Sequence, residues 1–200
     1  MNYDPTSIAD CLQKGGVVLV PTDTVYGLAA LPTDEAAVDR LFELKMRPRQ
    51  MHLPIMVANK KDLVALGVQM TDAADKLLQS PYMPGALTIV LGFKDDNRLP
   101  WLKGRDEIAI RIPDDARLLA VLEKTGPLLV TSANRHGWGD IPTKVPEILE
   151  ELDGEPDLVL DEGDVKVVPS TIINCRITPP VIERVGRIAE QELFDFLATP

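Results

Sequence analysis

The chain has 200 residues, 45% hydrophobic and 26% charged, which is enough for one well-buried domain and argues against disorder. Its formal net charge of -10 argues against a broad basic surface for nucleic acid. No apolar run reaches the roughly 20 residues of a membrane helix and no signal peptide is visible, so we expect a cytoplasmic protein without membrane attachment. Cys11 and Cys175 lie far apart, which predicts core positions rather than a disulfide framework or a zinc site.

Apolar periodicity and capping residues predict alternating helices and strands. Asp4 or Thr6 is the expected cap of the first helix, and Thr33 and Asp114 are the expected caps of two later ones. Pro54 suggests an edge strand or an irregular start. The predicted elements are, in chain order, a helix from Pro5 to the Gly15-Gly16 stop, a strand at 17–20, a helix at 34–45, a strand at 53–57, helices at 61–66 and 71–79, strands at 87–91 and 108–112, a helix at 115–122, a strand at 128–131, a helix at 145–152, strands at 158–160, 171–174 and 181–184, and a helix at 190–197. We expect one α/β domain over residues 1–200, with a twisted, mixed parallel/antiparallel sheet flanked by helices.

A polar octet, Pro21–Leu28 (PTDTVYGL), directly follows the first predicted strand. Ligands of open α/β sheets bind beyond the carboxyl ends of strands, so the octet is a candidate binding segment. It supplies hydroxyls, a carboxylate and a phenol, and Gly27 permits a close backbone approach. A turn that caps the next helix explains the same residues equally well.

The densest basic cluster is Lys45-Met46-Arg47-Pro48-Arg49. The chain contains neither a P-loop nor a Gly-x-Gly-x-x-Gly motif, so binding of phosphates would depend on such cations. Alternation about Met46 in extended backbone would aim Lys45 and Arg47 the same way. The alternative is that these cations simply favour a helix C-terminus.

Three further polar positions stand out. Arg111 lies in an apolar strand and needs an anionic partner, either a ligand or a structural salt bridge to Asp114 or Asp115. Ser132 lacks the Gly-x-Ser-x-Gly elbow of a hydrolase, so it is interpreted as a hydrogen-bonding residue or a turn cap. Arg184, on a late strand, could be an ordinary exposed residue.

Several short motifs occur in an order that resembles the YrdC-like family, whose stand-alone members are threonylcarbamoyl-AMP synthases of tRNA modification. Each motif is weak alone, and the ordered set carries the resemblance. It spans Val17 to Ile188, within a motif-bearing core at about 10–188. The motifs are Pro21–Leu28, Lys45–Pro48, Met83–Thr88, Ile110–Pro113 with Thr131–Asn134, and Pro169–Thr171 with Arg184–Gly186.

The resemblance implies a YrdC-like fold with a large concave site, and it assigns roles to matching residues. Catalytic and nucleotide-binding roles fall on Lys45 and Arg47, at the ATP phosphates, and further nucleotide contacts on Ser132, Asn134, Thr143 and Arg184. Threonine binding falls on Thr24, Arg111, Ser132 and Ser170. No residue is assigned to a metal, and a Mg²⁺ ion would be held mostly by the ATP phosphates and water.

Some positions depart from the family pattern. Met51 and Met56 stand where many members have Asn and His, which contact ATP and threonine, and His52 is a candidate to replace one of these contacts. The chain ends soon after Arg184–Gly186, so we expect none of the appended C-terminal domain of longer members.

The implied reaction joins L-threonine, bicarbonate or CO2 and ATP into threonylcarbamoyl-AMP and pyrophosphate, with tRNA threonylcarbamoyl-transferase proteins downstream. One alternative is an enzyme that forms carbamoyl-adenylate. Another is a non-catalytic paralogue that binds double-stranded or ribosomal RNA. Weak binding of tRNA or double-stranded RNA is a further candidate interaction. The net charge of -10 counts against RNA binding without excluding a local basic cavity.

Overall fold

The computed structural model describes residues 4–49, 51–94, 99–137, 140–165 and 168–199. Its strands are β1 (Val18–Val20), β2 (Gly27–Ala30), β3 (Ile55–Met56), β4 (Val68–Gln69), β5 (Leu87–Phe93), β6 (Ile108–Arg111), β7 (Leu128–Ser132), β8 (Leu158–Val159), β9 (Thr171–Asn174) and β10 (Val181–Arg184). Its helices are α1 (Pro5–Gln13), α2 (Glu35–Leu44), α3 (Lys60–Ala65), α4 (Asp72–Leu77), α5 (Ala116–Thr125), α6 (Val145–Glu151), α7 (Glu190–Ala198) and the short 3-10 helix η1 (Pro100–Leu102).

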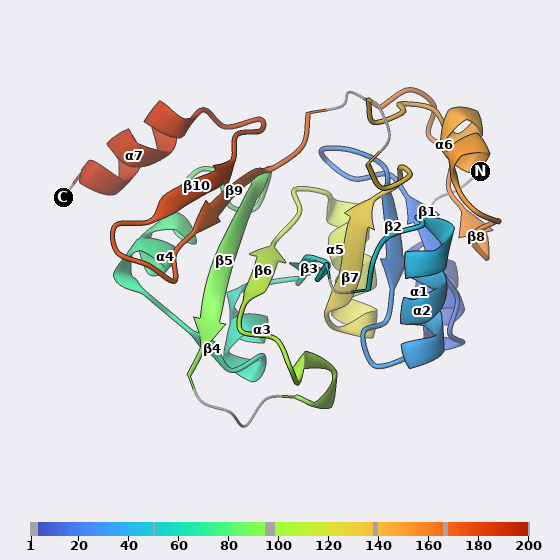
Figure 1. The fold of residues 1–200 in the computed structure, drawn as a ribbon, viewed down its shortest axis with the longest axis horizontal. Helices are drawn as coiled ribbons and strands as arrows, with labels where there is room; N and C mark the ends of the chain where they lie inside the picture. Colours follow the sequence, from blue (N-terminus) through green and yellow to red (C-terminus); the bar gives the residue numbers. More distant parts are fainter. Residues whose placement is uncertain (1–3, 50, 95–98, 138–139, 166–167, 200) are drawn as a thin grey trace.

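The strands form one mixed sheet in the order β10-β9-β5-β6-β3-β7-β2-β1-β8, with β4 pairing β5 beside this path (Figure 1). Three pairs are parallel, β1 with β8, β3 with β6, and β5 with β9, while the other pairs are antiparallel. This arrangement confirms the predicted α/β domain with a mixed sheet. Strands β3 and β6 join two halves of the molecule, one with β5, β9 and β10 and the other with β1, β2 and β7 (Figure 1).

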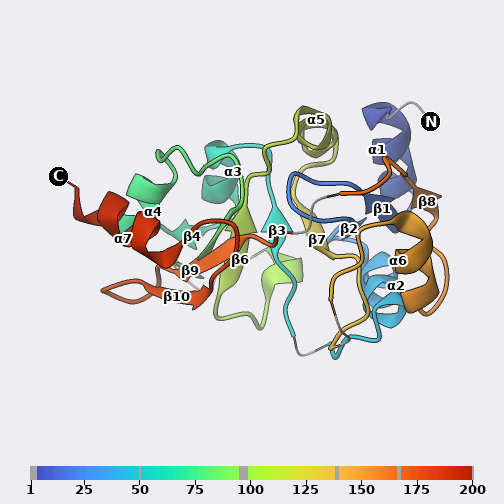
Figure 2. The same ribbon diagram turned by 90° about the horizontal axis from the view of Figure 1, so that it is seen from above.

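Helices cover both faces of the sheet. Strand β1 and the residue before it show why. Val17 and Leu19 belong to one buried cluster, and Val18 and Val20 belong to another. Helices α1 and α5 pack over the second of these clusters, whereas α2 and α6 cover the first on the other side (Figure 2). A strand covered on both faces reads as a continuous apolar run, as this one does.

Capping side chains fix where three helices begin. The α2 cap is Asp34, whose carboxylate accepts the Ala37 N–H, and the α5 cap is Asp115, so the predicted caps Thr33 and Asp114 were each one residue early. The α1 cap is Asp4, one of the two predicted candidates. Boundaries of this kind shift because adjacent polar residues offer similar acceptors.

Two strands escaped the sequence prediction, and a third differs from it. Strand β2 has the sequence GLAA, which lacks the β-branched signal, and β4 has only two residues. Strand β3 lies inside the sheet, between β6 and β7, so the expected edge position was wrong, although its start after Pro54 is short and irregular. Cys175 is buried and Cys11 is half-buried. Among the described helices, none has the length and apolar character needed to cross a membrane.

Candidate active site

A cavity of about 290 Å³ opens where the two halves of the sheet meet. Its walls come from the octet, the β6 and β7 ends, and the segment that leads into β9. Six predicted site residues line it: Thr24, Arg47, Arg111, Ser132, Ser170 and Arg184. Lys45, Asn134 and Thr143 are not among the lining residues. Lys45 and Asn134 lie two residues from Arg47 and Ser132, and Thr143 lies two residues from Ile141, which also lines the cavity.

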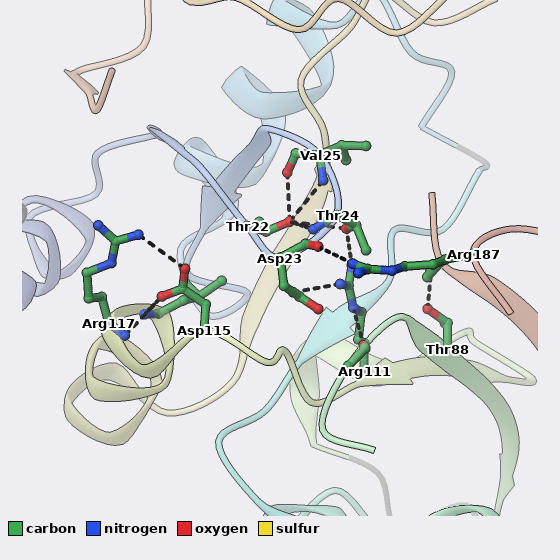
Figure 3. A network of polar contacts seen from close by, with 12 residues as sticks. Thr22, Asp23, Thr24, Val25, Thr88, Arg111, Asp115, Arg117 and Arg187 are labelled. Atoms are coloured by element: carbon green, nitrogen blue, oxygen red, sulfur yellow. Dashed lines mark hydrogen bonds and ion pairs between the residues drawn. The ribbon is translucent and has the colours of Figure 1, made fainter. Parts of the chain in front are cut away.

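Arg111 is the central cation of this cavity, and 5% of its surface is exposed. Its Nη2 donates to the Asp23 carboxylate over 2.7 Å, its Nη1 to the Thr24 hydroxyl over 2.7 Å, and its Nε to the Gly85 carbonyl over 2.9 Å (Figure 3). The structural alternative named Asp114 or Asp115 as the partner, and this was wrong. Asp115 instead caps α5, and the octet provides the carboxylate.

The two octet threonines divide their hydrogen bonds in a defined way. Thr22 Oγ1 donates to the Val25 carbonyl and accepts the backbone N–H groups of Thr24 and Val25, at 2.7, 3.1 and 3.2 Å (Figure 3). Both of its lone pairs are then used. The Thr24 hydroxyl, 3.1 Å away, accepts from Arg111, so its own proton can be donated into the cavity. The octet therefore combines a turn with part of the cavity wall, and it caps no helix.

On the opposite wall, Ser170 bridges two elements. Its hydroxyl lies 2.8 Å from the Thr88 hydroxyl of β5, and Arg184 Nη2 donates to the Ser170 carbonyl over 2.8 Å. The Arg184 guanidinium also lines the cavity, although the residue is exposed overall. Gly186 closes this wall, because a Cβ there would lie 2.2 Å from the Pro169 carbonyl oxygen. The motifs Pro169–Thr171 and Arg184–Gly186 thus pack directly against each other.

Lys45 approaches the end of β7 from α2. It is 1% exposed, and its ammonium donates to the backbone carbonyls of Ser132 and Asn134, the latter over 2.5 Å. Its own carbonyl accepts the His136 N–H over 3.0 Å. Burial lowers the pKa of Lys45 to about 7; the neighbouring Arg47 adds to this effect and Glu151 opposes it. Lys45 therefore anchors both ends of the 132–136 segment.

The backbone between Lys45 and Arg47 is a helix stop rather than an extended segment. Met46 has φ +50°, and it is the only non-glycine residue with positive φ among those described. The N–H groups of Met46 and Arg47 donate back to Glu43 and Phe42, which is the usual pairing of a left-handed C-terminal cap. The expectation that extended backbone would aim Lys45 and Arg47 the same way was wrong. The turn directs the Lys45 side chain to backbone carbonyls at the end of β7, whereas Arg47 lines the cavity.

Arg47 is half-buried, and its guanidinium donates to the carbonyls of Met51 and His52 over 3.3 and 3.4 Å. Desolvation lowers its pKa, but an arginine stays charged at physiological pH. His52 and Met56 line the cavity, whereas Met51 is 42% exposed and does not. The Met56 thioether thus provides an apolar wall.

Ser132 and Asn134 form a polar pair at the end of β7. The Ser132 hydroxyl donates to Asn134 Oδ1 over 2.6 Å, and the Asn134 amide donates to the Arg135 carbonyl. Thr143, farther along, accepts the Val165 N–H with its carbonyl, and its side chain is half-buried. The family resemblance assigned nucleotide contacts to these residues.

Carboxylates of the cavity are already engaged. Glu107 is paired with Arg176, and Glu183 accepts the Asn174 amide over 2.7 Å. Among the described residues, no group of three or more His, Cys, Asp or Glu side chains is placed to hold a metal ion.

Sequence reasoning missed Asp23 as a contributor to the site. It lies in the octet that drew attention, yet nothing in the sequence connects it to Arg111, which is 88 residues away. Thr88 was quoted within a motif without a role, and its contact with Ser170 was equally invisible. Only the β5–β9 and β6–octet contacts of the folded sheet bring these groups together.

The chain is similar to known proteins in sequence. The model of the Sua5/YciO/YrdC family, described as telomere recombination, matches residues 10–186. The threonylcarbamoyl-AMP synthase of Bacillus subtilis is 35% identical over 92% of this chain and 54% of its own length. A putative threonylcarbamoyl-AMP synthase of Methanocaldococcus jannaschii is 36% identical over 90% of this chain and 84% of its own length.

The fold also matches solved structures. The crystal structure of P. abyssi Sua5 complexed with L-threonine superposes with a TM-score of 0.86 at 31% identity, over 97% of this chain and 57% of that one. The chain spans about half the length of the first curated relatives it matches. A family model over most of the chain and two relatives above 30% identity leave one assignment, so the chain belongs to the Sua5/YciO/YrdC family.

Proposed function

We propose that this chain is a threonylcarbamoyl-AMP synthase, which forms threonylcarbamoyl-adenylate and pyrophosphate from L-threonine, bicarbonate or CO2, and ATP. The observation that carries the proposal is the cavity in which Arg47, Arg111 and Arg184 converge within a chain of net charge -10. The names of the relatives and the bound L-threonine of P. abyssi Sua5 support it. Such a product feeds tRNA modification, so the proposed setting is the cytoplasm, with tRNA threonylcarbamoyl-transferases as partners.

The amino acid fits the Arg111 end of the cavity. The guanidinium and the Thr24 hydroxyl are donors for its carboxylate, and Ser132 and Ser170 offer hydroxyls on either side. The apolar wall of Met56 is suited to an aliphatic side chain. A carboxylate and a small apolar group on one ligand describe a neutral aliphatic amino acid such as threonine.

The triphosphate fits the Arg47 end. Arg47 faces the cavity, and Lys45 is proposed as the second cation because its ammonium lies against Ser132 and Asn134, which are proposed to hold the nucleotide. At about 290 Å³ the cavity is at the lower limit for small-molecule sites, so it has room for the amino acid and the reacting phosphate. The nucleoside would lie at the rim, toward Asn134 and Thr143, with Arg184 on the other side.

The chemistry needs no protein nucleophile. The threonine amine attacks CO2 and loses a proton, which gives a carbamate; a carbamate oxygen then attacks the α-phosphorus in line, and pyrophosphate leaves. The protein positions the carbamate and neutralises charge on the triphosphate. A Mg²⁺ ion bound to the phosphates and water would supply further charge neutralisation.

The test is pyrophosphate release from ATP and bicarbonate with L-threonine, L-serine or no amino acid. We expect threonine-dependent release and, in Arg47→Ala, a fall of about 100-fold in kcat/KM for ATP, because one charged donor to the phosphates is lost. Arg49→Ala is the matched control, since Arg49 is two residues away, half exposed and paired with Asp39. Its activity should be unchanged.

Release without threonine dependence would refute the proposal. Carbamoyl phosphate would then be tested as the substrate of a carbamoyl-adenylate reaction. Binding of double-stranded RNA would be tested next against salt concentration, because binding driven by phosphate contacts weakens steeply as salt rises.

A further inference from the structure

Asp23 is a mostly buried residue that contacts the cavity-lining Arg111. Its side chain is 11% exposed, and its carboxylate is paired with Arg111 over 2.7 Å (Figure 3). Its backbone carbonyl accepts from Arg187 over 3.1 Å. Asp23 does not itself line the cavity, although its neighbours Thr22 and Thr24 do. The carboxylate therefore reaches a ligand only through Arg111.

Donor counting shows what this contact does for Arg111. A guanidinium has five N–H groups, and three of them are used by Gly85, Thr24 and Asp23. These three contacts hold all three nitrogens, Nη1 and Nη2 from the octet and Nε from the Gly85 carbonyl, so the planar group cannot rotate without breaking one of them. One N–H remains on each terminal nitrogen of a group that lines the cavity.

A purely structural bridge is a weak explanation of the pair. Burying two charges costs several kcal/mol of desolvation, and apolar residues of similar size generally stabilise a fold as well or better. Arg184 and Arg187 add positive charge near Arg111, so this end of the cavity keeps a positive excess even with Asp23 present. An arrangement with that charge suits a ligand anion.

We propose that Asp23 is a positioning residue for the amino-acid substrate. Its carboxylate fixes the Arg111 guanidinium so that the remaining N–H groups of Nη1 and Nη2 meet the substrate carboxylate. This inference rests on the proposed function, and it adds a residue that affects the binding of threonine but not the binding of ATP. The distinguishing consequence is a selective loss of affinity for threonine.

The first experiment separates the two substrates kinetically. In Asp23→Asn we expect KM for L-threonine to rise about tenfold, which corresponds to about 1.4 kcal/mol, with KM for ATP within about twofold. Asp157→Asn is the matched control, because Asp157 also pairs with an arginine, Arg40, over 2.6 Å but lies outside the cavity. It should leave both KM values unchanged.

A second variant guards against a loss of folding. Arg187→Ala removes an exposed side chain that holds the Asp23 carbonyl, and we expect about a threefold rise in KM for threonine alone. An unchanged KM for threonine in both variants, or an equal rise in both KM values, would overturn the proposal, because a structural bridge affects both substrates alike.

Calorimetric titration separates this proposal from the proposed function. L-Threoninol lacks the carboxylate, so it should bind the wild type weakly and Asp23→Asn equally weakly, whereas L-threonine should lose affinity in the variant. If threonine binds with this pattern but no pyrophosphate is released, only the synthase assignment fails. If the wild type binds threonine and threoninol equally, or binds neither, the Asp23 proposal fails.

Discussion

Arg111 and Lys45 are both buried at the site, and the cost of burying their charge is offset in different ways. Arg111 has an acidic partner, Asp23, and is held by three acceptors, two of them in the octet and the third at Gly85. Lys45 contacts only carbonyl oxygens of the 132–134 segment in its described hydrogen bonds, and no described carboxylate forms an ion pair with it. Burial lowers the pKa of both, but only Lys45 falls to about 7.

The difference follows from side-chain chemistry and neighbours. A guanidinium remains protonated in proteins, so its burial demands a counter-charge, which the octet supplies. An ammonium can lose its proton, so Lys45 can be accommodated without one. The Arg111 region is therefore a permanently charged site, suited to a carboxylate. The charge of the Lys45 region depends on pH near neutrality, because burial lowers the pKa of its ammonium to about 7.

Removing Arg111 should have the largest effect. In Arg111→Met the Asp23 carboxylate remains buried without its cation, and we expect the free energy of unfolding to fall by about 3–5 kcal/mol in urea titrations. The matched control is Arg40→Met, whose partner Asp157 is 34% exposed; it should lose about 1 kcal/mol or less.

Restoring charge balance sharpens this comparison. The double variant Arg111→Met with Asp23→Asn should recover part of the loss, because no unpaired charge then remains. Equal destabilisation at Arg111 and Arg40 would show that the buried pair is screened like a surface one, and the distinction between the two regions would fail.

The lowered pKa of Lys45 should make the free energy of unfolding depend on pH. The folded pKa, about 7, lies below the unfolded value of 10.5, so the unfolded chain binds more protons between these values. Stability contributed by this group is therefore lowest below pH 7 and rises with pH. Between pH 7 and 9 we expect the wild type to gain about 2 kcal/mol relative to Lys45→Met, measured by urea unfolding.

Lys60→Met is the control for general charge effects, because Lys60 pairs with Asp75 and is 47% exposed. Its difference from the wild type should stay flat over the same pH range. A flat difference for Lys45→Met as well would mean that the carbonyl contacts keep Lys45 fully charged, and the two cations would then be alike.

Much of the fold could be predicted because its elements carry local signals. The α1 cap, the apolar run of β1 and the amphipathic α2 and α5 all follow from periodicity and capping. Strand β2 could not, because GLAA is a strand only by pairing with β1 and β7, and Gly27 must pack closely against Val130. Tertiary pairing outweighs propensity there.

The site divides in a similar way. The need of Arg111 for an anionic partner followed from its place in an apolar strand, but the identity of that partner depended on a contact between β6 and the octet. The basic cluster was evident in the sequence, whereas its geometry was not, because Met46 gives no sign of a left-handed turn. That signal is normally a glycine.

Met46 offers the smallest effect, at the turn that separates Lys45 from Arg47. Met46→Gly should relieve the strain of φ +50°, which costs about 1–2 kcal/mol for a residue with a Cβ, and lose part of the gain to the greater freedom of unfolded glycine. We expect a net stabilisation of about 0.5–1 kcal/mol in urea unfolding. Because half of the Met46 surface is exposed, little packing is lost.

Met46→Ala keeps the Cβ and should give no gain, so equal stability of the two variants would show that the turn stores no strain. If Met46→Gly also leaves the pH dependence assigned to Lys45 intact, the turn sets only the directions of the Lys45 and Arg47 side chains, and the lowered pKa of Lys45 follows mainly from its burial.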